Sequence, residues 1–214
     1  MAILFLIFYN SCAYSQIIKS VGLSTGVSLS TSHIYQWQIT ELEYKTGAYS
    51  AANIDFFNNK YISCRTSVEY YQKGNKFLKL PIYNYITNTY AGVAENVKTE
   101  FDYLFFNISL KLSYPYKKFI PYLIIGCGYG HRVKTSDLKF KEYYGFDVST
   151  DFNVEAWVVS NGIGLSYEFQ KFALFCEYQN QYDINWLLES NNVGLKNNSS
   201  FIALGVNYLI NKNK

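Results

Sequence analysis

The stretch "LFFNISLKLSYPYKKFIPYLIIGCGYG", residues 104–130, decides the fold. On both sides of a four-residue break, Pro115 to Lys118, every second residue is apolar. The alternate positions hold Asn, Ser and Lys before the break and Gly after it. An alternation of period two is typical of β-strands with two unlike faces. The stretch therefore predicts two antiparallel strands joined by a tight turn, and it leaves open which face meets water.

The composition narrows the class of protein. Of the 214 residues, 49% are hydrophobic, 19% are aromatic and only 16% are charged. Soluble domains usually carry about 25% charged residues, so this chain has too few charges for an ordinary water-facing surface. The net charge is +3 and the basic residues are scattered, whereas nucleic-acid binding needs a clustered basic patch. We therefore expect a single domain without a nucleic-acid partner.

The first residues are typical of an export signal. Residues 2–9, "AILFLIFY", form an apolar core, and "AYS" at residues 13–15 is a small-x-small cleavage site. We expect a signal peptide over residues 1–15, cleaved after Ser15, followed by one mature domain over residues 16–214. Two alternatives stay open, namely a short buried strand at the N-terminus and a lipoprotein acylated at Cys12.

Eight segments repeat the period-two alternation. They lie at about 19–33, 47–57, 61–75, 99–114, 119–134, 155–169, 172–186 and 200–211. The connections after the second, fourth and sixth segments are short, whereas the other four are long, at about 34–46, 76–98, 135–154 and 187–199. Short turns at one end, long loops at the other and an even strand number are typical of bacterial outer-membrane barrels.

Closure is required if these strands enter a membrane. After the signal, no segment has the 18 or more consecutive apolar residues that a membrane helix needs. An open sheet edge in hydrocarbon would leave backbone groups unpaired, at a cost of several kcal/mol each. We therefore predict an all-β fold, an eight-stranded antiparallel up-and-down transmembrane β-barrel. A soluble exported barrel is the alternative.

The chemistry of the two faces indicates that lipid lies outside. A soluble barrel keeps its apolar face inside and needs a charged exterior. Here the polar phase is mostly Gly, Ser, Asn and Gln, which suits the crowded interior of eight strands. Aromatic residues near strand ends predict two interfacial girdles, formed by Tyr61, Tyr70, Tyr114, Tyr122, Tyr129, Trp157, Tyr178, Trp186 and Tyr208. The predicted lipid-facing residues are Leu104, Phe106, Ile108, Leu110, Leu112, Leu123, Ile125, Ile163, Leu165, Leu204 and Val206.

Five charged residues fall in the lumen phase. They are Arg65, Glu69, Lys111, Glu168 and Glu177. Charges inside a narrow barrel should pair, because an unpaired buried charge is costly. The polar network that they predict is either a structural plug of salt bridges or a selective conduit.

Catalytic and metal-binding signals are weak. The chain has two histidines, and His131 with Ser136 or Glu142 is a conceivable hydrolase constellation near the outer rim, although no spacing establishes it. Cys64, Cys127 and Cys176 all fall in the apolar phase and are interpreted as small lipid-facing residues. No Cys or His pair has the spacing of metal ligands, so we expect no catalytic residue, no metal and no cofactor.

The outer loops carry many aromatic residues. Residues 77–100 and 136–154 are rich in Tyr and Phe for exposed loops. Large exposed aromatics predict either strands that extend beyond the membrane or a contact surface for another protein or a glycan.

Five segments carry a family resemblance: "SVEYYQKGNK" (67–76), "DYLFFNISLKLSY" (102–114), "PYLIIGCGYG" (121–130), "GIGLSYEF" (162–169) and "ALGVNYLI" (203–210). The chain resembles the Bacteroidetes outer-membrane β-barrel domain family, often called PorT-like, over nearly its whole mature length. The resemblance implies an eight-stranded barrel, commonly without an assigned activity. Such proteins usually end on an aromatic residue, whereas here "LINKNK" follows Tyr208. Tyr208 is then the expected signal for the barrel-assembly machinery.

The expected function follows from the fold and the resemblance. We expect a non-enzymatic protein of the bacterial outer membrane that is a structural or interaction component of a larger envelope assembly. Its expected partners are outer-membrane lipid, the barrel-assembly machinery and other outer-membrane proteins. An outer-membrane lipid-modifying enzyme and a narrow channel are the alternatives.

Overall fold

A computed structural model of the chain describes residues 17–35, 42–57, 59–84, 89–136, 153–186, 188–190 and 193–210. These residues form ten β-strands: β1 Ile18–Tyr35, β2 Leu42–Glu43, β3 Lys45–Phe56, β4 Ile62–Asn84, β5 Thr89–Ser113, β6 Phe119–Ser136, β7 Glu155–Phe169, β8 Phe172–Asp183, β9 Leu188–Ser190 and β10 Val193–Leu209. Over the same ranges no helix is long and apolar enough to cross a membrane. The predicted signal peptide lies outside the described residues.

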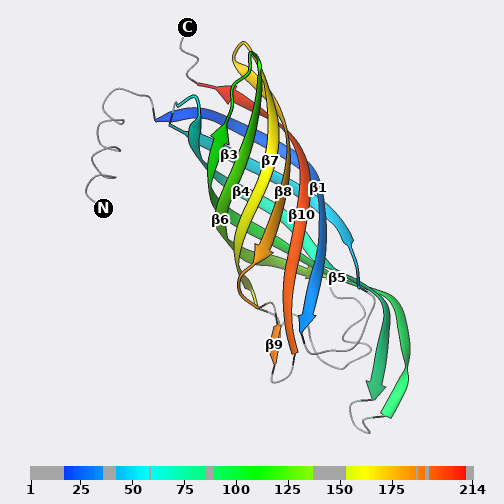
Figure 1. Ribbon diagram of the computed structural model, residues 1–214. Coiled ribbons are helices and arrows are strands. Elements are labelled where there is room, and N and C mark those ends of the chain that lie inside the picture. The colour runs from blue at the N-terminus through cyan, green and yellow to red at the C-terminus, as the bar shows by residue number, and fades with distance from the viewer. Residues whose placement is uncertain are drawn as a thin grey trace, which may run out of the picture.

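Eight long strands close into a barrel (Figure 1). Their order is β1-β3-β4-β5-β6-β7-β8-β10, and β10 pairs back with β1. Each pairing between neighbours is antiparallel, so the ring is an up-and-down barrel. The two short strands lie outside this ring, where β2 pairs with β4 and β9 pairs with β10. The predicted fold class is therefore confirmed.

The connections differ between the two ends of the barrel. Three short connections, residues 57–61, 114–118 and 170–171, lie at the end that we call the turn end. Each contains a non-glycine residue in the left-handed region, with φ values of 66° at Phe57, 57° at Lys117 and 50° at Gln170. The opposite end, the loop end, carries longer connections after β1, β6 and β8. The predicted alternation of short and long connections therefore holds except between β4 and β5, which only residues 85–88 separate.

The predicted loop over residues 76–98 is mostly a hairpin. β4 and β5 stay paired until Asn84 and Thr89, whereas β6 joins β5 only from Glu100 onward. The two strands therefore project beyond the others at the loop end, as Figure 1 shows. This result corrects the loop boundaries, because the backbone ladder continues where the neighbouring strands have ended. Most of the other predicted aromatic loop, residues 137–152, lies outside the described residues.

The apolar phase faces outward. The eleven residues predicted to meet lipid all lie on the exterior, with 38–63% of each side chain exposed. Tyr122 corrects the predicted girdle, because it is only 4% exposed and points into the lumen. It belongs to the phase of Ile124, whereas its neighbour Leu123 points outward.

The girdle at the turn end is a chain of touching rings. Ring centroids are 5.0 Å apart between Phe119 and Tyr167, 6.5 Å between Tyr167 and Phe169, 6.1 Å between Phe169 and Phe172, and 5.5 Å between Phe172 and Tyr208. Aromatic rings of this kind concentrate at the level of lipid headgroups. This row of aromatic rings therefore marks one membrane interface, on β6, β7, β8 and β10.

Glycines in the lumen phase give space to side chains of the next strand. A Cβ atom at Gly128 would lie 1.5 Å from Asn107 Oδ1, and one at Gly164 would lie 2.2 Å from Tyr122 Cζ. In each case the glycine stands directly opposite that residue in the antiparallel register. The missing side chain on one strand thus makes room for a large one on its neighbour.

A charge on the exterior should destabilise the barrel. Leu204 is 63% exposed on the outer face of β10. We expect Leu204→Arg to lower the free energy of unfolding by roughly 2–4 kcal/mol, since arginine is costly near the bilayer midplane. Urea titration of protein folded in phospholipid vesicles measures the change. Tyr90→Arg on the exposed hairpin is the control and should change stability by less than about 0.5 kcal/mol. Equal effects at both positions would contradict the lipid-facing assignment.

Candidate functional site

The lumen is the candidate site because it gathers the buried charges of the described strands. Side chains fill it in layers, from an ionic cluster near the turn end, through a layer of aromatic rings, to an ion pair nearer the loop end. Eight-stranded barrels leave an interior that side chains can fill, and this lumen follows that rule.

The ionic cluster consists of Asp55, Arg65, Lys111 and Glu177. Arg65 donates from Nε to Asp55 at 2.7 Å and from Nη1 to Glu177 at 2.8 Å. Lys111 Nζ lies 3.5 Å from the Asp55 carboxylate, and the Tyr122 hydroxyl donates to Glu177 at 2.8 Å. All four charged side chains are buried. Two cations thus meet two carboxylates, which compensates the cost of burying each charge.

Aromatic rings also contact the two cations of this cluster. The Arg65 guanidinium carbon lies 5.4 Å from the centre of the Phe175 ring, and Lys111 Nζ lies 4.0 Å from the centre of the Tyr122 ring. A cation near a ring face is attracted by the ring quadrupole, and more strongly so where water is excluded. The rings therefore stabilise the charged forms and fill the space beside them.

Glu69 lies further from the turn end and is held by neutral groups. Its carboxylate accepts hydrogen bonds from Ser67 Oγ at 2.7 Å and from Gln181 Nε2 at 3.4 Å, and Asn107 also bonds to it. The side chain is 4% exposed. Among the described residues no cation lies within salt-bridge distance of it, so amide and hydroxyl dipoles replace the water that it lost.

Five of the six rings in the buried apolar cluster form a layer across the lumen, and we call these five the aromatic plug: Tyr49, Tyr71, Tyr103, Phe105 and Phe201. Tyr49 stacks on Phe201 with centroids 3.9 Å apart, and Tyr71 meets both rings edge-on at 5.6 and 5.7 Å. Phe105 lies 6.3 Å from Tyr71 and 5.5 Å from Tyr103. Each of the five is at most 3% exposed, so the plug closes the middle of the lumen.

An ion pair covers the loop-end side of the plug. Lys73 Nζ lies 2.7 Å from the Asp183 carboxylate and 4.5 Å from the centre of the Phe105 ring. Lys73 is fully buried. Its position between a carboxylate and a ring face gives the ammonium two favourable contacts in place of water.

The structure brings together three of the five predicted lumen charges. Arg65, Lys111 and Glu177 meet in the ionic cluster. Glu69 lies in the neighbouring layer, while Glu168 is half-buried two residues before the turn at 170–171. The predicted polar network therefore divides between the cluster, the next layer and the turn end.

Three further paired lumen charges are not among the predicted ones: Asp55, Lys73 and Asp183. Lys73 continues the lumen phase of Arg65 and Glu69 on β4, so extending that alternation by four residues predicts that Lys73 points inward. Asp55 lies on β3, where small residues on both faces weaken the alternation. Asp183, the last residue of β8, continues the lumen phase of Glu177 and Gln181, so the same alternation predicts that it points inward.

Of the predicted hydrolase constellation, the pair of His131 and Ser136 is not assembled. His131 is exposed on the outer face of β6, and Ser136 lies five residues further along the same strand. At roughly 3.3 Å per residue their Cα atoms are about 16 Å apart, too far for a hydrogen bond between the side chains. Glu142 lies outside the described residues. Over the described residues no group of three or more His, Cys, Asp or Glu could hold a metal ion.

The cysteines of the described strands are free. Cys64 is partly exposed, and Cys127 and Cys176 are exposed on the outer surface. They lie on β4, β6 and β8, which are not neighbours in the ring. Their positions agree with the interpretation as small lipid-facing residues.

Solved structures show what this fold resembles. No protein-family model matches the chain, and no curated protein matches its sequence. The outer membrane protein OprG from Pseudomonas aeruginosa aligns with a TM-score of 0.51 and 9% identity over 91% of this chain and 98% of its own. The Neisserial surface protein A gives 0.49 and 13% over 89% and 97%, and Ail of Yersinia pestis gives 0.41 and 13% over 89% and 97%. The chain is an eight-stranded barrel of the outer-membrane type.

Breaking the Lys73–Asp183 pair should destabilise the barrel more than removing both charges. We expect Lys73→Met to lower the free energy of unfolding by about 3–5 kcal/mol, because it leaves the Asp183 carboxylate buried alone. Adding Asp183→Asn should recover much of that loss. Urea titration in vesicles measures both, with Lys98→Met at an exposed position as the control. A double variant as unstable as the sum of its single changes would contradict the pairing.

Removing rings from the aromatic plug should open a path for ions. We expect wild-type protein to give no steady conductance steps in planar bilayers, and Tyr71→Ala with Phe105→Ala to give them. Tyr70→Ala with Leu104→Ala is the matched control, because these residues precede the two rings in sequence and face outward. If wild-type protein conducts as well as the plug variant, the plug does not close the lumen.

Proposed function

We propose that the chain is a non-enzymatic barrel of the bacterial outer membrane that serves as a structural or interaction component of a larger envelope assembly. The observation that carries this proposal is the hairpin of β4 and β5, which extends beyond the ring while the lumen beneath it is filled. A filled barrel offers partners its outer surface and its projecting strands. The turn end then faces the periplasm, as in other bacterial barrels.

The hairpin has the mixed surface of an interaction site. Tyr90 is 61% exposed and Val93 is 45% exposed, and both lie beyond the point where β6 joins β5. The exposed residues Lys79 and Glu95 stand opposite each other on the same hairpin. Apolar and aromatic side chains framed by charges are typical of surfaces that bind other proteins.

The base of the hairpin is braced, which suits a binding element. β2 pairs with β4 at Lys76 and Phe77 as a third strand. Lys76 Nζ also lies 2.5 Å from the Glu43 carboxylate of β2. A braced hairpin loses less conformational freedom when it binds, so more of the contact energy contributes to affinity.

The expected partners belong to the same proposal. They are outer-membrane lipid around the exterior, the barrel-assembly machinery during insertion and other outer-membrane proteins at the hairpin. The resemblance to the PorT-like family and export by the signal peptide over residues 1–15 are likewise proposed. The exposed ring of Tyr208, 41% accessible on the last long strand, supports its role as the terminal signal.

Shortening the hairpin should release the partner without unfolding the barrel. Replacing residues 80–94 by Asn-Gly keeps Lys79 opposite Glu95, and a two-residue turn can reconnect the ladder there. We expect proteins that co-purify with the full-length chain from native membranes after cross-linking to be lost with the shortened one. The shift between heated and unheated protein on a gel should persist and report folding.

A matched variant tests surface chemistry rather than length. Tyr90→Ser with Val93→Ser keeps the hairpin and removes two of its exposed apolar side chains, so it should weaken co-purification as well. Identical sets of cross-linked proteins from wild type and both variants would contradict an interaction role for the hairpin.

A further inference from the structure

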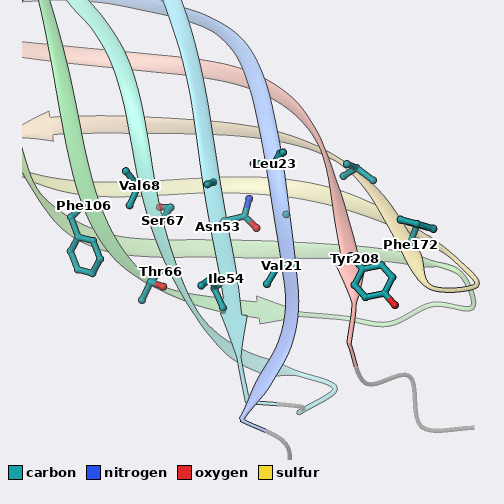
Figure 2. Close-up of a pocket in the computed structure, with 13 residues that line it drawn as sticks. Val21, Leu23, Asn53, Ile54, Thr66, Ser67, Val68, Phe106, Phe172 and Tyr208 are labelled. Carbon is teal, nitrogen blue, oxygen red and sulfur yellow. The ribbon is translucent and has the colours of Figure 1, made fainter.

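An apolar groove of about 600 Å³ crosses the outer surface of the barrel. Side chains of β1, β3 and β4 form its floor, with Val21, Ile54 and Thr66 among them. Phe106 of β5 lies on one side, and Phe172 and Tyr208 lie on the other, as Figure 2 shows. The groove is therefore part of the surface that faces the membrane.

Small side chains on β3 create this groove. Ala52 stands between Leu23 of β1 and Val68 of β4 in the register of the sheet. Leu23 is 65% exposed and Val68 is 47% exposed, so both rise above the methyl group of the alanine. A short side chain between two long ones leaves a surface groove along β3.

Lysines surround the turn end of the groove. Lys19 lies two residues before Val21 on the same strand, and its Nζ donates to the carbonyl oxygen of Asn59 at 3.0 Å. The exposed Lys60 follows Asn59 in the same turn. On the other side, Lys171 precedes the groove residue Phe172, and its carbonyl oxygen accepts a hydrogen bond of 2.8 Å from Leu209 at the end of β10.

The charge at the turn end is almost entirely of one sign. In the described turns and adjoining strand ends, five lysines are at least partly exposed: Lys19, Lys60, Lys117, Lys118 and Lys171. Glu168 is the one partly exposed acid in those segments, because Asp55 is buried and paired with Arg65. At the loop end, by contrast, lysines alternate with Glu43, Glu95 and Glu100.

We propose that this groove and its lysines form a binding site for an anionic phospholipid of the leaflet at the turn end. One acyl chain lies in the groove, and the phosphate and anionic headgroup lie against Lys19 and Lys171. Basic residues at a membrane surface attract anionic lipid, and ammonium groups donate charge-assisted hydrogen bonds to phosphate oxygens. The ring chain that ends at Tyr208 places the lysines at headgroup depth.

The charges favour a lipid over a second copy of the chain. A second barrel would bring lysines of the same sign to the same interface, and repulsion would oppose that contact. A lipid satisfies both parts of the site at once, with an apolar tail for the groove and an anion for the lysines. The inference is independent of the proposed interaction role of the hairpin, which lies at the opposite end of the barrel.

Native mass spectrometry of the full-length protein in detergent tests the headgroup. Phosphatidylglycerol and phosphatidylcholine with the same dioleoyl chains are titrated separately, and bound lipids are counted. We expect one phosphatidylglycerol to bind in preference to phosphatidylcholine. Lys19→Gln with Lys171→Gln should weaken the binding of phosphatidylglycerol by about thirtyfold, because each lysine near an anionic lipid contributes about 1 kcal/mol. Lys98→Gln with Lys134→Gln removes the same charge at the loop end and should leave binding unchanged.

A groove-filling variant tests the acyl chain. Ala52→Phe fills the floor and should reduce the binding of phosphatidylglycerol, whereas Ala48→Phe lies on the same face of β3 outside the groove and should not. The gel shift on heating reports whether each variant folds. If Ala52→Phe does not fold, the lysine variants alone test the proposed lipid site. Equal binding of both lipids, equal effects of the two lysine pairs or protein dimers in place of bound lipid would overturn the proposal.

Discussion

The pairing of β1 with β10 is the contact on which the rest of the structure depends. It runs from Ser20 opposite Leu209 to Tyr35 opposite Gly194 and leaves no long strand of the ring with an open edge. In hydrocarbon an unpaired backbone group costs several kcal/mol, so only closure makes these strands stable in a membrane. Closure with eight strands then sets a narrow lumen, and the narrow lumen determines which side chains fit inside.

The narrow lumen explains why the interior is so varied in chemistry. Charges can stay inside because Arg65 binds two carboxylates and Lys73 binds a third. Aromatic rings occupy the middle, where they stack and meet edge-on as in a protein core. The molecule therefore has a compact core, which is a column of mixed polarity enclosed by the sheet, while a largely apolar surface faces outward.

Much of this architecture follows from the sequence, because closed barrels impose a strict period of two. The eight strands, the three turns and the outward face of Leu104 or Ile163 can be predicted from alternation alone. The position of Tyr122 follows from it too, because alternation from the outward Leu123 and Ile125 turns Tyr122 inward, although an aromatic residue near a strand end also suits a girdle. Whether Tyr122 faces inward depends on the parity of its strand, which Ile124 shows only when the alternation is followed strictly.

The ion-pair partners of a lumen residue are harder to predict than the face of the sheet on which it lies. Alternation predicts that Arg65 points inward, but it does not predict that Arg65 binds Asp55 on β3 and Glu177 on β8. That choice depends on the stagger of the strands around the ring, which a single sequence does not show. The extent of the β4–β5 hairpin is similar, since continued backbone pairing depends on the partner strand and not on either strand alone.

The glycines that face large side chains carry a consequence for how this barrel can change over time. Gly128 and Asn107, or Gly164 and Tyr122, share one fixed volume across two strands. A larger residue at either glycine requires a smaller one opposite, so neither position can vary by itself. Such pairs should be inherited together, and their joint substitution in related barrels would record the register of the sheet as a pattern of covariation.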